Sequence, residues 1–259
     1  MTPENVLVHV QDHIANVTLN RPHSLNALND GLKYGLIDAL KKLDKDESTR
    51  AIILTGTGKA FCAGGDIQGF KKRYNDFKAR GGCPEYYSNI LGETILNISK
   101  PIIAAINGLA IGGGLSIAIA CDIRIASENA VFSAAYLLVG ATPEIGSSYI
   151  LPRLIGLGKA SELVFTGKKI DSSEAERIGL VNKVVPEAEL KKATHEIAKK
   201  IASLSPVAVR LAKKALRHGM ESTLSQALDY ETHLLTYCFG TKEHYEAINA
   251  LLSSRKQVD

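Results

Sequence analysis

Two glycine-rich segments constrain the fold of this chain more than any other part of it. Residues 50–67 read RAIILTGTGKAFCAGGDI, and residues 100–121 read KPIIAAINGLAIGGGLSIAIAC. Each begins with a short apolar run, passes through a glycine cluster and leads into a predicted helix. Such a run is typical of a strand that is buried on both faces. Two strand–glycine–helix units in succession therefore predict an α/β protein with a layered core.

The neighbouring sequence predicts further elements of such a core. Residues 6–20 alternate apolar and polar side chains around a short break, which predicts an antiparallel hairpin. Residues 30–44 carry apolar residues at helical spacing, a second helix is expected near 86–98, and residues 122–127 read as a strand. The polar, glycine-broken residues 71–86 predict a mobile loop or a weakly held helix.

The C-terminal part of the sequence is mainly helical. Residues 168–185 predict a capped helix that ends at Gly179, followed by a short strand. From Glu187 onward the helical periodicity is almost unbroken. A helical region with apolar faces and no sheet of its own needs a surface to pack on, so we expect a neighbouring subunit there. A chain of 259 residues is long enough for one main domain with such an appendage.

Composition narrows the classes of function. The formal net charge is only +4 and no dense basic run is present, which argues against a nucleic-acid binder. No secretory signal or membrane-length apolar stretch is visible, so we predict a cytoplasmic protein without a membrane span. The cysteines are scattered without metal-binding spacing, which favours reduced, buried thiols; they are Cys62, Cys83, Cys121 and Cys238.

The glycine clusters are the first candidate sites for chemistry. The sequence contains no P-loop, dinucleotide-binding, zinc-protease or nucleophile-elbow motif. Ala63–Asp66 and Gly112–Gly114 each lie where a strand passes into a helix, and a helix N-terminus offers backbone N–H groups without internal partners. One N–H from each cluster could hold a developing oxyanion. Taken alone, either cluster is better explained by tight packing of strand against helix.

Together, these motifs resemble those of a known family. AFCAGGDI and KPIIAAINGLAIGGGLSIAIACDIRIAS occur in the order and spacing of the enoyl-CoA hydratase/isomerase (crotonase) family. NRPHSLNAL near the start also resembles this family, as do FTGKKIDSSEAERIGLVNKVV and FGTKEHYEAINALLSSRK farther along. The resemblance covers almost the whole chain.

The resemblance implies a fold and a substrate class. The expected architecture is a spiral core of ββα units over residues 1–200 and a helical trimerisation region over residues 201–259. The implied substrate is an acyl-CoA thioester, of the kind met in fatty-acid metabolism, whose carbonyl oxygen is held by the N–H groups of Gly65 and Gly113. The implied assembly is a homotrimer or a dimer of trimers. No metal or redox cofactor is implied, because coenzyme A is part of the substrate.

The resemblance also assigns residues to coenzyme A. Ala63 and Ile67 correspond to positions that contact adenine, and Leu25 and Ala27 lie beside the pantetheine arm. Lys256 resembles a lysine that reaches coenzyme A from the C-terminal region. The same binding site includes the remaining members of the two glycine loops, which are Gly64, Asp66 and Gly112.

This sequence departs from the hydratase pattern at the two catalytic carboxylates. Hydratases of the family use two glutamates to add water to a 2-enoyl-CoA, and those positions are here Ser116 and Tyr136. Neither a serine hydroxyl nor a phenol is a good base at neutral pH. We therefore expect both side chains to line the pocket, with a polar role for Ser116.

Glu144, in TPEIGSS, is the remaining acid at a recognised position. Thr142 and Pro143 predict that a helix begins here, and from local sequence alone Glu144 would stabilise that helix end. The segment also resembles the Δ3,Δ2-enoyl-CoA isomerase branch, in which a single glutamate eight residues after the missing second carboxylate is the base. A helix N-terminus would favour the ionised carboxylate, whereas burial would favour the protonated acid.

Three functions remain open from the sequence. The first is isomerisation of a 3-enoyl-CoA with Glu144 as proton shuttle. The second keeps the fold and the oxyanion site for other chemistry, such as hydration of an enoyl-CoA or unusual dienoyl-CoA, decarboxylation, hydrolysis or C–C cleavage. The third is a catalytically silent acyl-CoA-binding module.

Overall fold

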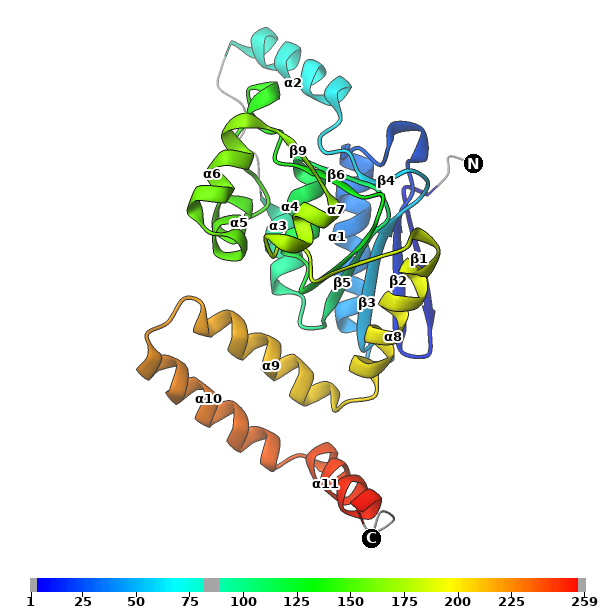
Figure 1. Ribbon diagram of the computed structural model, residues 1–259, viewed down its shortest axis with the longest axis vertical. Coiled ribbons are helices and arrows are strands. Elements are labelled where there is room, and N and C mark those ends of the chain that lie inside the picture. The colour runs from blue at the N-terminus through cyan, green and yellow to red at the C-terminus, as the bar shows by residue number, and fades with distance from the viewer. Residues whose placement is uncertain (1–3, 82–88, 256–259) are drawn as a thin grey trace.

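The computed structural model describes residues 4–81 and 89–255, and the side chains up to residue 253. Two sheets form the centre of the described chain, and helices surround them (Figure 1). The larger sheet has six strands, in the spatial order β1 (Val6–Gln11), β2 (Ile14–Leu19), β3 (Ala51–Gly56), β5 (Ile102–Ile106), β7 (Ile123–Ser127) and β10 (Lys183–Val185). β1 and β2 form the predicted antiparallel hairpin, and the pairs from β2 to β10 are parallel.

The smaller sheet consists of three-residue strands that the sequence did not predict. Its order is β4 (Ala60–Cys62), β6 (Leu109–Ile111), β8 (Val131–Ser133) and β9 (Lys169–Asp171). β4, β6 and β8 are parallel, whereas β9 runs antiparallel to β8. Three strands of the large sheet, β3, β5 and β7, are each followed along the chain by a strand of the small sheet and then by a helix. This is the predicted order of ββα units.

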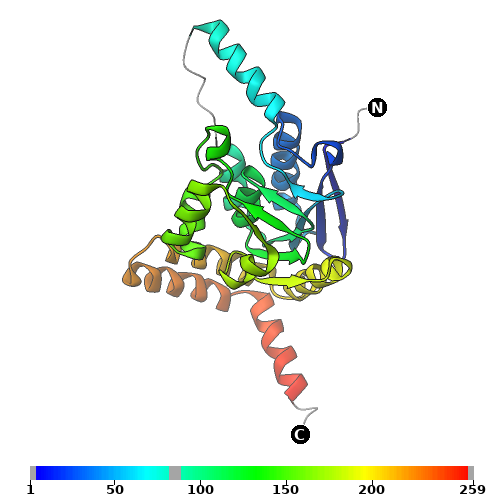
Figure 2. The same ribbon diagram turned by 45° about the horizontal axis from the view of Figure 1, so that its top comes forward.

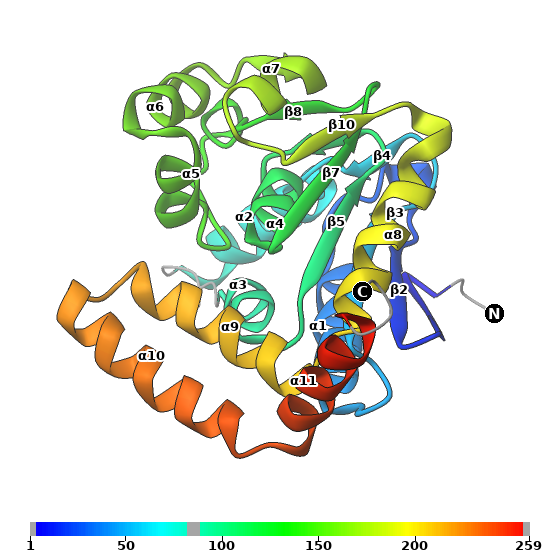
Figure 3. The ribbon, with the colours of Figure 1, turned by 60° about the horizontal axis from the view of Figure 1, so that its bottom comes forward.

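Helices cover the large sheet on both faces. α1 (Asp30–Lys45) begins where the Asn29 side chain accepts a hydrogen bond from the N–H of Leu32, at 2.8 Å. Its apolar stripe packs into the main core, together with α3 (Ile90–Asn97) and α4 (Gly113–Ala120). α8 (Leu190–Ala202) packs on the opposite face, against side chains such as Ile53 and Ile103 (Figure 3).

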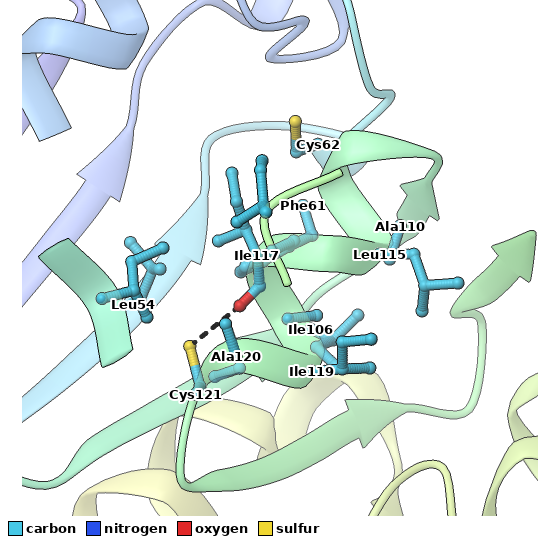
Figure 4. Close-up of a cluster of buried hydrophobic side chains, with 14 of the residues drawn as sticks. Leu54, Phe61, Cys62, Ile106, Ala110, Leu115, Ile117, Ile119, Ala120 and Cys121 are labelled. Atoms are coloured by element: carbon cyan, nitrogen blue, oxygen red, sulfur yellow. Dashed lines mark hydrogen bonds between the residues drawn. The ribbon is translucent and has the colours of Figure 1, made fainter. Parts of the chain in front are cut away.

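The α4 helix lies in the centre of the main core. Every residue of α4 is buried, and Figure 4 shows Leu115, Ile117 and Ile119 extending from it in different directions among side chains of both sheets. The neighbours drawn there include Leu54 of β3 and Phe61 of β4. An all-apolar helix of this kind requires burial on every side. The start of α4 is therefore held firmly in position.

Several further helices complete the chain. α2 (Ile67–Arg80) confirms the helical alternative for residues 71–80, has no buried residue and projects from the core in Figure 2. Residues 82–86 of that prediction lie outside the described residues. α7 (Ser172–Arg177) ends just before Gly179, whose φ is +80°, as predicted. The remaining short helices are η1 (Pro22–Ser24), η2 (Leu137–Val139), α5 (Ser147–Ile155), α6 (Leu157–Thr166), α7 (Ser172–Arg177) and η3 (Glu187–Glu189).

Charged groups attach the first C-terminal helix to the sheet. α9 (Pro206–Gly219) places the Lys213 ammonium 2.6 Å from Asp122 and 2.8 Å from the carbonyl oxygen of Lys100. Arg217 pairs with the same aspartate at 2.9 Å. Asp122 also accepts the N–H of Ile102, at 2.8 Å. This network joins α9 to the ends of β5 and β7.

The last two helices lie away from the sheets. α10 (Leu224–Phe239) packs along α9, and α11 (Lys242–Arg255) extends from it (Figures 2 and 3). Described side chains of α10 leave large apolar groups exposed, among them Leu224, Leu228, Leu235 and Phe239. The predicted division at residue 200 stays a prediction; α8 reaches Ala202 and packs on the sheet.

Candidate active site

The two glycine loops lie against one another because the strands before them are neighbours. β4 leads into the loop at Gly64 and β6 leads into Gly112, and these two strands pair in parallel (Figure 1). Gly64 has a φ of +92°, and a Cβ atom there would come within 2.7 Å of the Ile111 carbonyl oxygen and 3.5 Å of the Gly113 nitrogen. Only glycine permits both this backbone conformation and this approach. The two loops therefore form one continuous surface.

The predicted oxyanion donors keep their N–H groups available. Gly65 is bridged to Leu28, with the N–H of Leu28 donating to the Gly64 oxygen at 2.7 Å and the N–H of Asp66 donating to the Leu28 oxygen at 3.1 Å. In this pattern the N–H of Gly65 itself points away from Leu28. Gly113 is the first residue of α4, where an N–H has no partner within the helix. No described residue accepts a hydrogen bond from either N–H.

The segment assigned to pantetheine runs beside the first glycine loop. The N–H of Ala63 donates to the Leu25 carbonyl oxygen at 3.0 Å, so this segment lies next to the loop at Ala63–Asp66. Its contact with pantetheine stays a prediction. Leu25 is 40% exposed and Ile67 is 71% exposed, which leaves both side chains accessible to a ligand.

The Asp66 side chain is occupied within the protein. It pairs with Arg21 at 3.1 Å and accepts the N–H of Gln68 at 3.1 Å, which caps α2. Arg21 also donates to the oxygen of Ala27. Sequence reasoning missed this role of Arg21, although it lies in the NRPHSLNAL motif. Lys256, the other residue assigned to coenzyme A, lies outside the described residues.

Ser116 and Tyr136 form a neutral, hydrogen-bonded pair. Their hydroxyl oxygens are 2.7 Å apart, and both side chains are buried. Ser116 also donates to the Gly112 oxygen at 3.2 Å, so the Tyr136 hydroxyl is left to donate to Ser116. Burial raises the pKa of Tyr136 further above its ordinary value. Neither hydroxyl is suited to remove a proton at neutral pH.

Glu144 lies before a helix and not in its first turn, so that part of the sequence prediction is wrong. α5 begins at Ser147 with Gly146 as its N-cap. The N–H of Ser147 donates to the backbone carbonyl oxygen of Glu144 at 3.0 Å. Ile145 and Gly146, between them, have φ of +56° and +77°. A left-handed, β-branched residue costs of order 1–3 kcal/mol and persists only where the surroundings impose it.

Tertiary packing imposes this turn. The Ile145 side chain is buried, and a Cβ atom on Gly92 of α3 would come within 3.0 Å of the Ile145 Cα atom. Local sequence cannot report such a contact between segments that are far apart in the chain.

The Glu144 carboxylate instead lies against the start of α4. A Cβ atom on Gly113 would come within 2.7 Å of Glu144 Oε1. The helix N-terminus that acts on this acid is therefore that of α4. Burial raises the pKa of Glu144, while the cations of Lys33 and Arg73 lower it. The net direction is upward, as expected for a carboxylate prepared to take a proton.

A small cavity lies beside Ile145, the residue after Glu144, and no motif in the sequence predicts which side chains meet there. The lining residues are Leu28, Asn29, Asp30, Lys33, Arg73, Asn89, Leu91 and Ile145. One signal in the sequence could have identified Lys33. It occupies a position in line with Leu36, Ile37 and Leu40 on the apolar stripe of the helix, where a charge is unexpected.

Among the described residues, the thiols and possible metal ligands form no second reactive centre. Cys62 and Cys121 are buried, as predicted, and burial raises the pKa of each to about 12. Cys238 is half-buried, and Cys83 lies outside the described residues. Across residues 4–81 and 89–255, no three His, Cys, Asp or Glu side chains lie close enough to hold a metal ion. No helix in this part of the chain is long and apolar enough to cross a bilayer.

Similar proteins are known for nearly the whole chain. A family model described as enoyl-CoA hydratase/isomerase matches residues 9–258. The short-chain-enoyl-CoA hydratase of Clostridium acetobutylicum is 41% identical over 261 residues, which cover 99% of this chain and 97% of that protein.

Solved structures with the same fold as this chain include one named as a hydratase and one named as an isomerase. The enoyl-CoA hydratase from Bacillus anthracis has a TM-score of 0.88 and 36% identity, over 96% of each chain. The monofunctional enoyl CoA isomerase from M. smegmatis has a TM-score of 0.74 and 35% identity, over 87% of this chain and 99% of that one.

Proposed function

The chain belongs to the enoyl-CoA hydratase/isomerase family, and on that premise we propose that it is a Δ3,Δ2-enoyl-CoA isomerase with Glu144 as its proton shuttle. The α/β crotonase fold predicted from the sequence is confirmed by the similarity to solved structures. Membership of the family also makes the chain an enzyme acting on acyl-CoA thioesters. The observation that carries the isomerase proposal is the position of the Glu144 carboxylate against Gly113, while Ser116 and Tyr136 are hydrogen-bonded to one another.

The proposed reaction needs one base and one oxyanion site. Glu144 removes a proton from C2 of the 3-enoyl thioester, and the electron pair spreads over the thioester oxygen and C4 as a dienolate. The N–H groups of Gly65 and Gly113 stabilise the negative oxygen, each donor contributing about 3 kcal/mol. The protonated Glu144 then returns its proton to C4, which leaves the double bond between C2 and C3. Atoms and charge balance without a co-reactant, and the proposal includes no metal or redox cofactor.

The electrostatic surroundings of Glu144 suit this role. A shuttle must accept a proton and release it again, and the best pKa for that task lies nearer neutrality than that of an ordinary carboxyl. Burial moves the pKa of Glu144 in that direction, and the Lys33 and Arg73 cations limit the shift.

Hydration of an enoyl-CoA is the second candidate function, because the names of relatives favour it. Several curated relatives carry hydratase names, including the one from Clostridium acetobutylicum. Water addition usually recruits two groups, one for the water and one for the α-carbon. Here the two positions are Ser116 and Tyr136, whose hydroxyls are hydrogen-bonded to one another and are poor bases at neutral pH. This supports the isomerase over the hydratase. Similarity to the isomerase from M. smegmatis supports it as well.

The test compares two substrates and two variants. Purified protein is given trans-3-hexenoyl-CoA and, separately, crotonyl-CoA, with Glu144→Gln and the control Glu93→Gln measured alongside. Glu93 is an exposed glutamate on α3. We expect rapid isomerisation of the first substrate, unchanged in the control and reduced by at least about 10³-fold in Glu144→Gln.

A folding control accompanies the kinetics. Because burial raises the pKa of Glu144 in the fold, this carboxyl stabilises the protein below its ordinary pKa, and that contribution is lost as pH rises through the raised value. At pH 7 the Glu144→Gln variant should therefore unfold at a temperature no lower than the parent.

Two outcomes of the kinetic test would contradict the isomerase. Faster turnover of crotonyl-CoA than of 3-hexenoyl-CoA would establish the hydratase instead. Tight binding without turnover of either thioester would indicate a silent binding module.

The predicted homotrimer or dimer of trimers and the cytoplasmic location remain part of the proposal. The exposed apolar side chains of α10 support an oligomer, because such a surface is stabilised when a second copy covers it. Light scattering coupled to size-exclusion chromatography distinguishes the trimer from the hexamer, and a monomer would contradict both.

A further inference from the structure

Gly65 and Gly113, the two proposed oxyanion donors, differ in what holds them in place. Gly113 begins α4, a helix that is buried throughout and surrounded by side chains of both sheets. Gly65 precedes α2, which has no buried residue and projects from the core (Figure 2). Packing of the following helix therefore fixes Gly113 but cannot fix Gly65. The Gly65 N–H needs another support if it is to keep its direction during the reaction.

Backbone hydrogen bonds to the segment before α1 supply part of that support. The N–H of Leu28 donates to the Gly64 oxygen at 2.7 Å, and the Leu28 oxygen accepts the N–H of Asp66 at 3.1 Å. Gly65 lies between these two bonds, so its N–H turns with any movement of Leu28. The position of residues 25–28 therefore sets the direction of the oxyanion donor.

Residues 25–28 include a sparsely populated backbone conformation that the rest of the protein must hold. Leu25 and Asn26 have φ of +51° and +56°, which is the left-handed region. The buried Asn26 amide donates to the backbone oxygens of Thr57 at 3.0 Å and Ala60 at 2.8 Å. These bonds attach one end of the segment to the chain around the β3–β4 turn, and they leave its other end to other contacts.

Arg21 holds that other end. Its guanidinium donates from Nη1 to the Ala27 oxygen and from Nη2 to the Asp66 carboxylate, and the second of these bonds is 3.1 Å long. Ala27 lies on one of the two bonded segments and Asp66 on the other, directly after Gly65, so the guanidinium joins them. Only 18% of each side chain of the ion pair is exposed, which limits screening by salt. A planar group with two donors fixes both distance and angle, unlike a single ammonium.

We propose that Arg21 is a positioning residue for catalysis, and that its guanidinium keeps the Gly65 N–H directed at the thioester oxygen. The inference rests on the oxyanion site of the proposed function, which places that oxygen between Gly65 and Gly113. Arg21 acts through the backbone in this account and does not contact the substrate. Its loss should therefore lower the rate constant for isomerisation more than the affinity for coenzyme A esters.

The size of the effect follows from the geometry. Removal of an oxyanion donor costs about 10²- to 10³-fold in kcat, and a displacement of about 1 Å at a reacting group costs about 10²-fold. In Arg21→Gln the Gly65 N–H is displaced and not removed, so we expect kcat with trans-3-hexenoyl-CoA to fall by about 10- to 100-fold. The dissociation constant for hexanoyl-CoA should change by less than about fivefold.

Further variants identify the interaction. Asp66→Asn removes the charge from the pair and keeps an oxygen that can accept the N–H of Gln68 and cap α2. It should lower kcat as Arg21→Gln does, and the double variant should be no slower than the slower single one, because both changes break the same contact. Arg21→Lys should recover part of the lost rate, since it keeps the charge but not the paired donors. The matched control, Arg177→Gln, removes an exposed arginine that pairs with Glu174 at 2.6 Å and should leave kcat unchanged.

The carbonyl vibration of a bound thioester reports the oxyanion site directly. Hexanoyl-CoA with ¹³C at the thioester carbon has no double bond to move, so it serves as an unreactive probe. Hydrogen bonds from Gly65 and Gly113 weaken its C=O bond and lower its infrared frequency. At saturating ligand we expect this lowering in the parent and in Arg177→Gln, and a smaller one in Arg21→Gln and Asp66→Asn. A loss of stability alone would not change the band of the folded, bound protein.

The outcomes separate this inference from the proposed function. An unchanged carbonyl band in both Arg21→Gln and Asp66→Asn would overturn the inference, whatever happens to kcat, and leave the isomerase intact. Weaker binding of hexanoyl-CoA with an unchanged band would show that Arg21 binds the coenzyme A portion itself, which also overturns it. No lowering of the band in the parent would overturn the inference together with the oxyanion site.

Two remaining cases are also decided by the band. If the parent lowers the carbonyl frequency but does not isomerise trans-3-hexenoyl-CoA, the proposed function fails, and a smaller lowering in Arg21→Gln still supports the inference. If Arg21→Gln does not fold, Asp66→Asn and Arg21→Lys carry the same comparison, and a band equal to that of the parent in both would overturn it.

Discussion

Replacing Gly113 with alanine tests the contact on which the proposed mechanism depends. The new methyl group would lie 2.7 Å from Glu144 Oε1 and 2.9 Å from Leu28 Cδ1. Both atoms are at the far ends of side chains, so they can withdraw. To reach an ordinary contact of 3.4 Å, the carboxylate oxygen must move by about 0.7 Å. A displacement near 1 Å at a reacting group costs about 10²-fold in rate, so we expect kcat to fall by about 10- to 100-fold.

Stability should change far less than activity. Gly113 lies in a helix with a permitted backbone, where alanine is favoured over glycine by up to about 1 kcal/mol. Crowding against Leu28 costs about as much in the opposite direction. The free energy of unfolding should therefore stay within about 1 kcal/mol of the parent. Kinetics with trans-3-hexenoyl-CoA and urea denaturation monitored by circular dichroism measure the two quantities.

Two other glycines provide the comparison. A Cβ atom on Gly114 would lie 2.0 Å from the Cys62 carbonyl oxygen, so Gly114→Ala forces backbone apart and should destabilise the fold. Gly158, in α6, has nothing within 4 Å of its added Cβ, and Gly158→Ala should be both stable and active. A Gly113→Ala enzyme with full activity and an intact fold would show that the Glu144 carboxylate does not act from this position. So would a Gly113→Ala protein as unstable as Gly114→Ala.

Three further predictions concern pH, the neutral pair and the attachment of α9. Activity should fall as pH drops through the raised pKa of Glu144. Lys33→Met should shift this loss of activity to higher pH, because it removes a cation that lowers the pKa of Glu144. The pH profiles of kcat/KM for the parent and the variant check both predictions. Tyr136→Phe should reduce stability by about 1 kcal/mol in urea denaturation and activity by less than about fivefold, because Ser116 keeps its bond to the Gly112 oxygen. Asp122→Asn should lower the free energy of unfolding by about 3 kcal/mol, because it leaves two α9 cations without their counter-ion; an unchanged denaturation midpoint would contradict the role of this network.

Much of the fold could be predicted from local pattern alone. β3 and β5 are recognisable because parallel strands with both faces covered need continuous apolar runs, and α1 because its stripe and its Asn29 cap are local features. The small sheet could not be predicted, because its three-residue strands are too short to show a period. Those strands nevertheless bring the Gly64 and Gly112 loops together.

Some features of the candidate site are also predictable from the sequence, and others are not. The amino-acid sequence is enough to identify Glu144 as the remaining acid at a recognised position, and to place glycine loops before α2 and at the start of α4. The surroundings of that acid follow from the packing of distant segments. Ile145 adopts a left-handed turn because Gly92 packs against it, and Lys33 and Arg73 reach the same cavity from different helices. Such contacts join residues far apart in the chain, and their energies depend on burial and distance, which no local pattern encodes.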